Sequence, residues 1–181
     1  MTVDFGRTAD DYARHRAGFP PEFFARLERL GRLRAGMTAL DLGAGTGTIA
    51  LGLAARGAAV TALDPAAAML AQAAARAKEA GLALRTIEAK AESTGLPDAA
   101  FDLAVAGQCW HWFDRPRAAV EVLRVLKPGG TLMIAHFDWL RLAGGVVAAT
   151  EDLILAHNPA WAGAGKSAPY AAWYLDLRDG G

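Results

Sequence analysis

A glycine-rich loop near residue 40 is the part of this sequence best suited to hold a ligand. It reads Asp41-Leu42-Gly43-Ala44-Gly45-Thr46-Gly47 and joins a short apolar run to a helical pattern. Glycine permits positive φ angles and lets a ligand approach the backbone without a Cβ in the way. The free N–H groups at the start of the helix near Thr46 attract a negative group, by about 0.3–1 kcal/mol at exposed sites. The loop therefore predicts a binding site for a small charged ligand.

The spacing of the glycines separates the classes of ligand. A dinucleotide-binding loop has the pattern G-x-G-x-x-G, whereas Thr48 stands in the place of the third glycine when Gly43 and Gly45 are the first two. The acid Asp41 before the loop would repel a pyrophosphate, but it suits the ammonium of a methionine moiety. A Walker A loop is excluded because no Gly-Lys-Ser/Thr follows the glycines. A nicotinamide-dependent oxidoreductase stays open as the less favoured alternative.

A second acid, Asp64, ends the next apolar run. A carboxylate at this place reaches ribose hydroxyls as a two-oxygen acceptor. Pro65 then opens a helix, where its missing N–H costs nothing. Met69, one turn further on, either packs on an adenine face or belongs to the core. The two acids and the glycines together predict a nucleoside-containing ligand at the carboxyl ends of the first two strands.

Short apolar runs alternate with longer helical patterns along the chain, which predicts an α/β fold. Several runs are apolar at successive positions, as expected for strands buried on both faces of a parallel sheet between helices. We expect a three-layer, doubly wound parallel sheet of about five strands. The predicted strands are Thr38–Leu42, Ala59–Leu63, Ala83–Ala89, Phe101–Gly107 and Thr131–Phe137. The predicted helices are Pro21–Leu33, Thr46–Arg56, Pro65–Ala80, Arg115–Leu126 and Gly145–His157.

Length and composition favour one globular domain that acts on a small molecule. The 181 residues are 53% hydrophobic and 21% charged, and 19 basic residues balance 19 acidic ones. No basic excess indicates a nucleic-acid partner or a membrane surface, and no apolar run approaches the roughly 20 residues of a membrane span. The single cysteine, Cys109, cannot form an internal disulfide, and the absence of zinc-ligand spacing predicts no metal. A cytoplasmic location is the default expectation.

Four blocks of the sequence resemble the class I S-adenosylmethionine-dependent methyltransferases, in particular the small-molecule branch known as methyltransferase type 11. The first block is the glycine loop, and the second is Ala62-Leu63-Asp64-Pro65 with Met69-Leu70. The third runs from Ala91 to Asp114 and includes Trp110-His111-Trp112. The fourth is Val122-Leu123-Arg124-Val125-Leu126-Lys127-Pro128-Gly129-Gly130. The resemblance implies S-adenosyl-L-methionine as the cofactor and methyl transfer to a small molecule as the reaction.

The resemblance also implies the roles of individual residues in cofactor binding. The loop and its acid would hold the methionine end, Asp64 the ribose, and the backbone N–H of Ala91 the adenine edge. Lys90 stands where some relatives have an acidic contact to the adenine amine. The implied cofactor-binding residues are Asp41, Gly43, Ala44, Gly45, Asp64, Pro65, Met69, Ala91, Glu92 and Gln108.

The acceptor side is predicted to lie beyond the fourth strand. Methyl transfer from a sulfonium needs collinear approach above all, and positioning can supply ~7–11 kcal/mol of such a barrier. A hydroxyl or carbon acid also needs a base, for which His111 is the candidate, unless it is only a packed loop histidine. A carboxylate acceptor needs no base but a cationic clamp such as Arg16. The implied substrate-pocket residues are Tyr12, Arg16, Trp110 and Trp112, although the tryptophans can equally fill the core.

The end of the sequence bears on the completeness of the fold. We expect a single domain with a helical lead-in at 1–35, a cofactor-binding core at 36–137 and an incomplete helical segment at 138–181. Relatives continue with a sixth and a seventh strand that have no counterpart here, which predicts a truncated chain. The run Thr131–Phe137 would then be an exposed sheet edge that supports a homodimer. A non-catalytic binding module built on the cofactor fold is therefore the second alternative.

Overall fold

A computed structural model describes residues 18–137 and 142–161 of the chain. These residues divide into two compact units, one that ends at Ala135 and one that begins at His136. The second unit contains the helix α6 (Val146–His157). No helix within the described ranges is long and apolar enough to cross a membrane. Residues 138–141 and 162–181 of the predicted helical segment lie outside the described residues.

The first unit is built on one parallel sheet of five strands. Its strands lie in the order β3-β2-β1-β4-β5, so the chain moves outward from β1 in one direction and then returns to the other side of β1. The predicted α/β fold with about five parallel strands is confirmed. The strands are β1 (Thr38–Leu42), β2 (Ala59–Asp64), β3 (Arg85–Glu88), β4 (Phe101–Gly107) and β5 (Leu126–Ala135).

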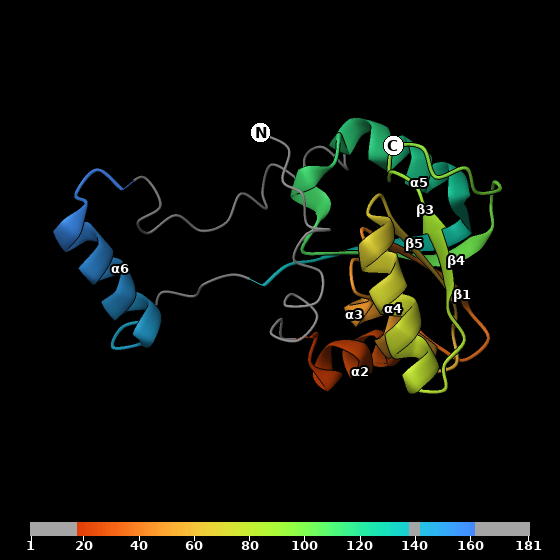
Figure 1. Cartoon of the computed structure of the whole chain (residues 1–181), viewed down its shortest axis with the longest axis horizontal. Coiled ribbons are helices and arrows are strands. Elements are labelled where there is room, and N and C mark those ends of the chain that lie inside the picture. Colours follow the sequence, from red (N-terminus) through yellow and green to blue (C-terminus); the bar gives the residue numbers. More distant parts are fainter. Residues whose placement is uncertain (1–17, 138–141, 162–181) are drawn as a thin grey trace. The chain divides into compact units, whose positions relative to one another are not determined.

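Helices flank both faces of this sheet, as Figure 1 shows. Crossovers between parallel strands are right-handed, so helices that follow strands on the two sides of β1 cover opposite faces. Accordingly α3 and α4 pack beside β1, β2 and β3, whereas α5 packs beside β5. The helices of this unit are α2 (Pro21–Arg29), α3 (Thr48–Ala54), α4 (Ala67–Glu79) and α5 (Arg115–Val125), with a short 3-10 turn, η2 (Trp110–Trp112).

Several elements begin or end at residues other than those predicted, and capping explains two of the differences. The helix α3 starts at Thr48 because Gly47, with φ +80°, is still outside the helix. The helix α4 starts at Ala67, two residues after Pro65, because the side chain of Asp64 accepts a hydrogen bond from the N–H of Ala66 and holds a turn there. The turn η2 was not predicted.

Strand β5 begins earlier than the predicted Thr131. Leu126 pairs with Phe101, and the regular ladder resumes at the pair Leu103–Thr131 after a shift of register. Gly129, with φ +79°, lies in the irregular part of β5 between these two pairs. β3 and β5 are the edges of the described sheet, and pairing of β5 with a second chain stays a prediction.

An ion pair ties together the amino-terminal ends of three strands. Asp102 Oδ2 on β4 accepts hydrogen bonds from the Thr38 N–H and hydroxyl on β1, both at 2.8 Å, and from Lys127 Nζ on β5 at 2.9 Å. These bonds, the Thr38 N–H first and Lys127 second, lower the pKa of Asp102 to about 2. Asp102 and Lys127 belong to two of the blocks that carry the family resemblance, and both act here as structural residues at the end of the sheet opposite the glycine loop.

We predict that Asp102→Asn lowers the free energy of unfolding by about 1–3 kcal/mol at pH 7, since three donors lose a charged acceptor. Because the pKa of Asp102 is lower in the folded chain than its usual 3.8, its contribution is present above pH 4 and is lost as the pH falls towards 2. Urea unfolding of both proteins at several pH values measures the difference. A loss that does not shrink below pH 4, or that adds fully to the loss from Lys127→Met, would contradict this network.

Candidate functional site

The three glycines of the loop between β1 and α3 differ in how closely other side chains pack against them. Gly43, Gly45 and Gly47 all have positive φ. A Cβ on Gly43 would lie 2.9 Å from Cys109 Sγ, and one on Gly47 would lie 2.9 Å from the Ala73 Cβ, so these two glycines are required by packing. Among the described residues, a Cβ on Gly45 would meet only Met69 Cε, at 3.7 Å, which is an ordinary van der Waals contact. Gly45 is therefore the loop position where a ligand can approach the backbone.

Asp64 joins this loop to the start of α4. Its Oδ2 accepts a hydrogen bond from the Gly45 N–H at 2.9 Å, and its Oδ1 accepts one from the Ala66 N–H at 2.8 Å. Burial raises the pKa of Asp64 and the two backbone hydrogen bonds oppose that effect. Each carboxylate oxygen can accept a further hydrogen bond, so the group is held in place and still able to bind ligand hydroxyls.

Asp41 lies beneath the loop and is 1% exposed. Its Oδ2 accepts a hydrogen bond from the N–H of Ala50 at 2.9 Å, which satisfies a backbone donor in the first turn of α3. Burial raises the pKa of Asp41 to about 8, the hydrogen bond from Ala50 opposes this, and the charge of Asp64 adds to it. The contact of Asp41 with the methionine end of the ligand stays a prediction.

The electrostatics of this region favour a cation. Two carboxyl groups, Asp41 and Asp64, have raised pKa values because burial penalises their charged forms. The neighbouring Cys109 thiol is also held protonated, since burial and then the two carboxylates raise its pKa well above 9. Its Sγ donates to the Leu42 carbonyl at 3.1 Å. A ligand with positive charge would offset the cost of ionising both acids.

Helix α4 supports the loop through residues that the sequence reading missed. Arg76 Nη1 donates to the carbonyl oxygen of Thr46 at 2.9 Å, and Ala73 packs beneath Gly47. Met69, Ala73 and Arg76 are spaced four and three residues apart, so they share one face of α4. This spacing could have identified Ala73 and Arg76 from the sequence, because Met69 was already expected to lie beside the ligand.

The segment after β3 forms a tight turn beside Asp64. The Ser93 N–H donates to the Lys90 carbonyl, so Ala91 and Glu92 occupy the centre of the turn. Ala91 is buried, Lys90 is exposed, and Pro65 on the neighbouring loop is exposed too. Glu92, predicted to close over the adenine edge, points its Oε1 at the N–H of Asp114 at 2.7 Å. Its described role is therefore to anchor the turn to the start of α5.

The segment after β4 carries the predicted acceptor-side residues. Gln108 adopts φ +60°, rare for a residue other than glycine, and its N–H donates to the Ala135 carbonyl at 2.8 Å. Trp110 is 1% exposed and packs edge-on against Phe113. His111 and Trp112 are exposed, with ring centroids 4.9 Å apart. Trp110 is thus a core residue, whereas the other two are accessible.

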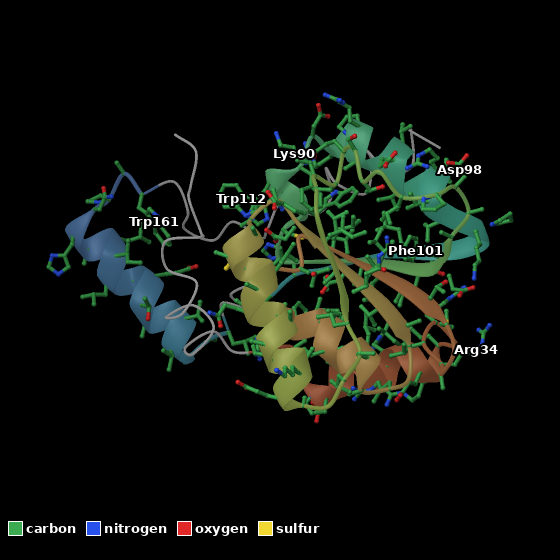
Figure 2. All side chains as sticks on the ribbon, turned by 45° about the vertical axis from the view of Figure 1, so that its right-hand side comes forward. Arg34, Lys90, Asp98, Phe101, Trp112 and Trp161 are labelled. Atoms are coloured by element: carbon green, nitrogen blue, oxygen red, sulfur yellow. The ribbon has the colours of Figure 1, made fainter. Side chains whose placement is uncertain are left out.

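These segments meet at the carboxyl ends of the strands. Figure 2 shows Lys90 after β3 and Trp112 after β4 at the end of the sheet away from Arg34, which precedes β1. Contact between Cys109 and Gly43 brings the end of β4 against the glycine loop. The strand order reverses between β1 and β4, which is where ligands bind in open parallel sheets. Tyr12 and Arg16 lie outside the described residues.

Comparison with known proteins identifies the family. A family model described as a methyltransferase domain matches residues 40–134, which include the glycine loop, Asp64 and the segments after β3 and β4. This chain belongs to that methyltransferase family. The match stops one residue before the end of β5, so it covers the part of the sheet that carries the site.

Two curated relatives support membership of the methyltransferase family. An uncharacterized methyltransferase of Mycobacterium tuberculosis is 35% identical over 158 residues, which are 84% of this chain and 62% of the relative. A demethylmenaquinone methyltransferase of Thermus thermophilus is 43% identical over 101 residues, or 54% of this chain and 46% of the relative. The chain thus spans less than two thirds of the length of either relative.

Solved structures also support the methyltransferase fold. A protein of Methanococcus maripaludis assigned to the S-adenosyl-L-methionine-dependent methyltransferases matches with a TM-score of 0.73 at 20% identity, covering 99% of this chain and 87% of that one. At this identity the likeness concerns the fold alone.

We predict that Asp41→Asn stabilises the fold at high pH. The folded pKa of about 8 exceeds the ordinary 3.8, so the folded chain keeps a proton that the unfolded chain releases, and stability falls as the pH rises from 4 to 8. The side-chain amide oxygen of Asn still accepts the hydrogen bond from the Ala50 N–H, and the amide has no charged form whose burial destabilises the fold. Urea unfolding at pH 5, 7 and 9 is expected to show a gain that grows with pH. A variant less stable than the native chain at pH 9 would disprove the burial argument.

Proposed function

We propose that this chain binds S-adenosyl-L-methionine across the carboxyl ends of β1, β2 and β3, and transfers its methyl group to a small-molecule acceptor. The observation that carries the proposal is the arrangement at Gly45, where a Cβ would make only an ordinary contact with Met69 among the described residues, next to the Asp64 carboxylate. An acid that already holds the loop backbone is oriented to accept from ribose hydroxyls. Dinucleotide binding has less support, because Thr48 replaces the third glycine of that fingerprint.

The residues present fit this cofactor chemically. Its ammonium and sulfonium groups carry positive charge, which suits a site where burial raises the pKa of two carboxyl groups. Asp64 would hold the ribose, Gly45 would give the ligand access to the loop backbone, and Met69 would pack beside the adenosine. The central position of Ala91 in its turn suits a backbone contact with the adenine edge. When bound, the cofactor supplies a methyl group already activated for nucleophilic attack.

The chain's own residues would then position the acceptor and manage its proton. His111 is exposed after β4 and would take the proton of a hydroxyl or carbon acid. A carboxylate acceptor would need no base. Gln108 follows β4 with a strained backbone, and such strain is often kept where it aims a side chain at a ligand. The relative named demethylmenaquinone methyltransferase supports an organic small molecule as the class of acceptor.

Gly45→Ala tests the location of the cofactor. We expect affinity for S-adenosylhomocysteine, measured by calorimetry, to fall about tenfold or more, because an added methyl group in ligand space costs ~1–3 kcal/mol. Gly81→Ala is the matched control. Its φ of +66° imposes similar backbone strain, but no atom of the described residues lies within 4 Å of the added Cβ. Equal affinity in the two variants would place the ligand elsewhere, and a native chain stabilised by NADH but not by S-adenosylhomocysteine would refute the proposed function.

His111→Ala tests the acceptor chemistry. With a protonated acceptor found by screening small molecules for methyl transfer, we expect turnover to fall about 10²–10⁴-fold while affinity for S-adenosylhomocysteine stays unchanged. His157→Ala on α6 serves as a control for loss of a histidine. Normal turnover in His111→Ala would show that this histidine only packs beside Trp112.

A further inference from the structure

The loop between β3 and β4 lies along helix α5 and is hydrogen-bonded to residues near both ends of that helix. Near the start of α5, Glu92 accepts from the Asp114 N–H, as described above. At the end of α5, the N–H groups of Ala99 and Ala100 donate to the carbonyls of Arg124 and Val125, at 2.9 and 2.8 Å. These hydrogen bonds hold the first part of the loop against the start of α5 and its last residues against the end of α5.

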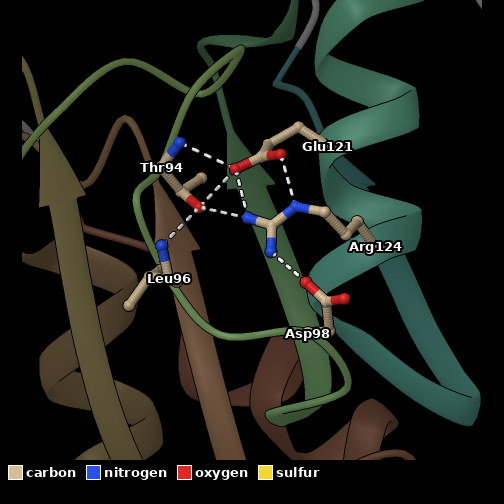
Figure 3. Close-up of polar contacts among 5 residues, drawn as sticks. All are labelled: Thr94, Leu96, Asp98, Glu121 and Arg124. Carbon is tan, nitrogen blue, oxygen red and sulfur yellow. Dashed lines mark hydrogen bonds and ion pairs between the residues drawn. The ribbon is translucent and has the colours of Figure 1, made fainter.

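The middle of the loop is held by a cluster of charged side chains, which Figure 3 shows. We call Thr94, Asp98, Glu121 and Arg124 the α5 clamp. Glu121 Oε1 accepts from the Thr94 N–H at 2.8 Å and from its hydroxyl at 2.6 Å. Arg124 donates to both oxygens of Glu121, at 2.8 and 2.7 Å, and its Nη1 also pairs with Asp98. The Arg124 guanidinium on α5 thereby connects two residues of the loop, Thr94 through Glu121 and Asp98 directly.

The clamp is densely hydrogen-bonded at Thr94 and Glu121 and open to solvent at Asp98, whose side chain is 78% exposed. Thr94 is 3% exposed, and its hydroxyl also accepts from the Leu96 N–H. The Glu121 side chain is 14% exposed and the Arg124 side chain 35%. The hydrogen bond from Arg124, the largest cause, lowers the pKa of Glu121 to about 2, with Thr94 assisting. The ionised clamp is therefore present throughout the neutral range, and both charges have planar, two-point partners.

The clamp adjoins the turn that faces the nucleoside side of the site. Ala91 and Glu92 occupy the centre of the turn closed by Ser93 and Lys90, and Thr94 follows directly. That turn follows β3, which pairs with β2 so that Glu88 lies opposite Asp64. A nucleoside held at Asp64 therefore extends towards this turn. The turn is closed by the hydrogen bond from the Ser93 N–H to the Lys90 carbonyl, and in the proposed function the N–H of Ala91 would be the donor to the base.

We propose that Glu121 and Arg124 are positioning residues for base recognition: through Thr94 and Asp98 they hold the turn at Ala91 in the geometry that selects adenine. This rests on the proposed cofactor function. A backbone donor matches the N1 acceptor of adenine, whereas hypoxanthine carries a hydrogen at N1 and presents a donor there. A fixed turn therefore selects between the two bases, and a loosened turn does so less well.

The test compares the affinities of S-adenosylhomocysteine and S-inosylhomocysteine by calorimetry. In the native chain we expect clear preference for the adenosine compound. In Glu121→Gln the preference is expected to fall about fivefold to tenfold, the effect of one weakened hydrogen bond, with affinity for the inosine compound nearly unchanged. Glu28→Gln is the matched control, because it removes an ion pair with Arg56 on the other face of the sheet.

A second variant keeps the test valid if Glu121→Gln folds poorly. Thr94→Val preserves side-chain shape and removes only the hydroxyl, and melting temperatures show whether each variant is folded. We expect Thr94→Val to reduce the preference for adenine in the same direction, and the double variant to lose less than the two separate losses combined.

The outcomes separate this inference from the proposed function. A native chain that does not bind S-adenosylhomocysteine refutes the proposed function itself. A native chain that binds both compounds equally, or folded clamp variants that keep the full preference for adenine, overturn the positioning role while the cofactor site stands. A loss of preference equal to that of Glu28→Gln would also overturn it, since it would reflect general destabilisation.

Discussion

The two backbone hydrogen bonds accepted by Asp64 are the interaction on which the site depends. They join the glycine loop after β1 to the first turn of α4, at the point where β2 ends. The carboxyl group is partly buried there, and burial raises its pKa. The same contacts that order the loop therefore hold an acid whose ionisation is penalised, a cost that the positive charge of the proposed cofactor would relieve.

Residues that mark the family in the sequence do not all serve the ligand. Asp102 and Lys127 stand in two of the blocks that resemble the family, yet they connect the amino-terminal ends of β1, β4 and β5, at the end of the sheet opposite the glycine loop. Asp41 also has a structural contact, because it accepts a hydrogen bond from the first turn of α3. The blocks that resemble the family thus contain residues that hold the strands of the sheet together as well as residues of the site. Both are needed, because a loop can be ordered only when the strands beneath it are in register.

Helix α5 has a role in the site although none of its residues was expected there. It gives Glu92, Thr94 and Asp98 of the preceding loop their partners, from its capping residue to its last turn. The loop has little regular structure of its own, so its backbone groups need such partners to stay ordered. These contacts connect the segment around Ala91 to α5, which is the basis of the positioning role proposed for Glu121 and Arg124.

The sequence alone determined β1, β4 and the parallel α/β class, because apolar runs, glycines and prolines report local conformation directly. It also located the loop, Asp64 and Met69. The tertiary structure alone decided that Gly43 must accommodate Cys109, that Arg76 holds Thr46, and that Glu92 bonds to Asp114. Those contacts join residues distant in the chain, and they depend on strand order and helix placement, which no local pattern encodes.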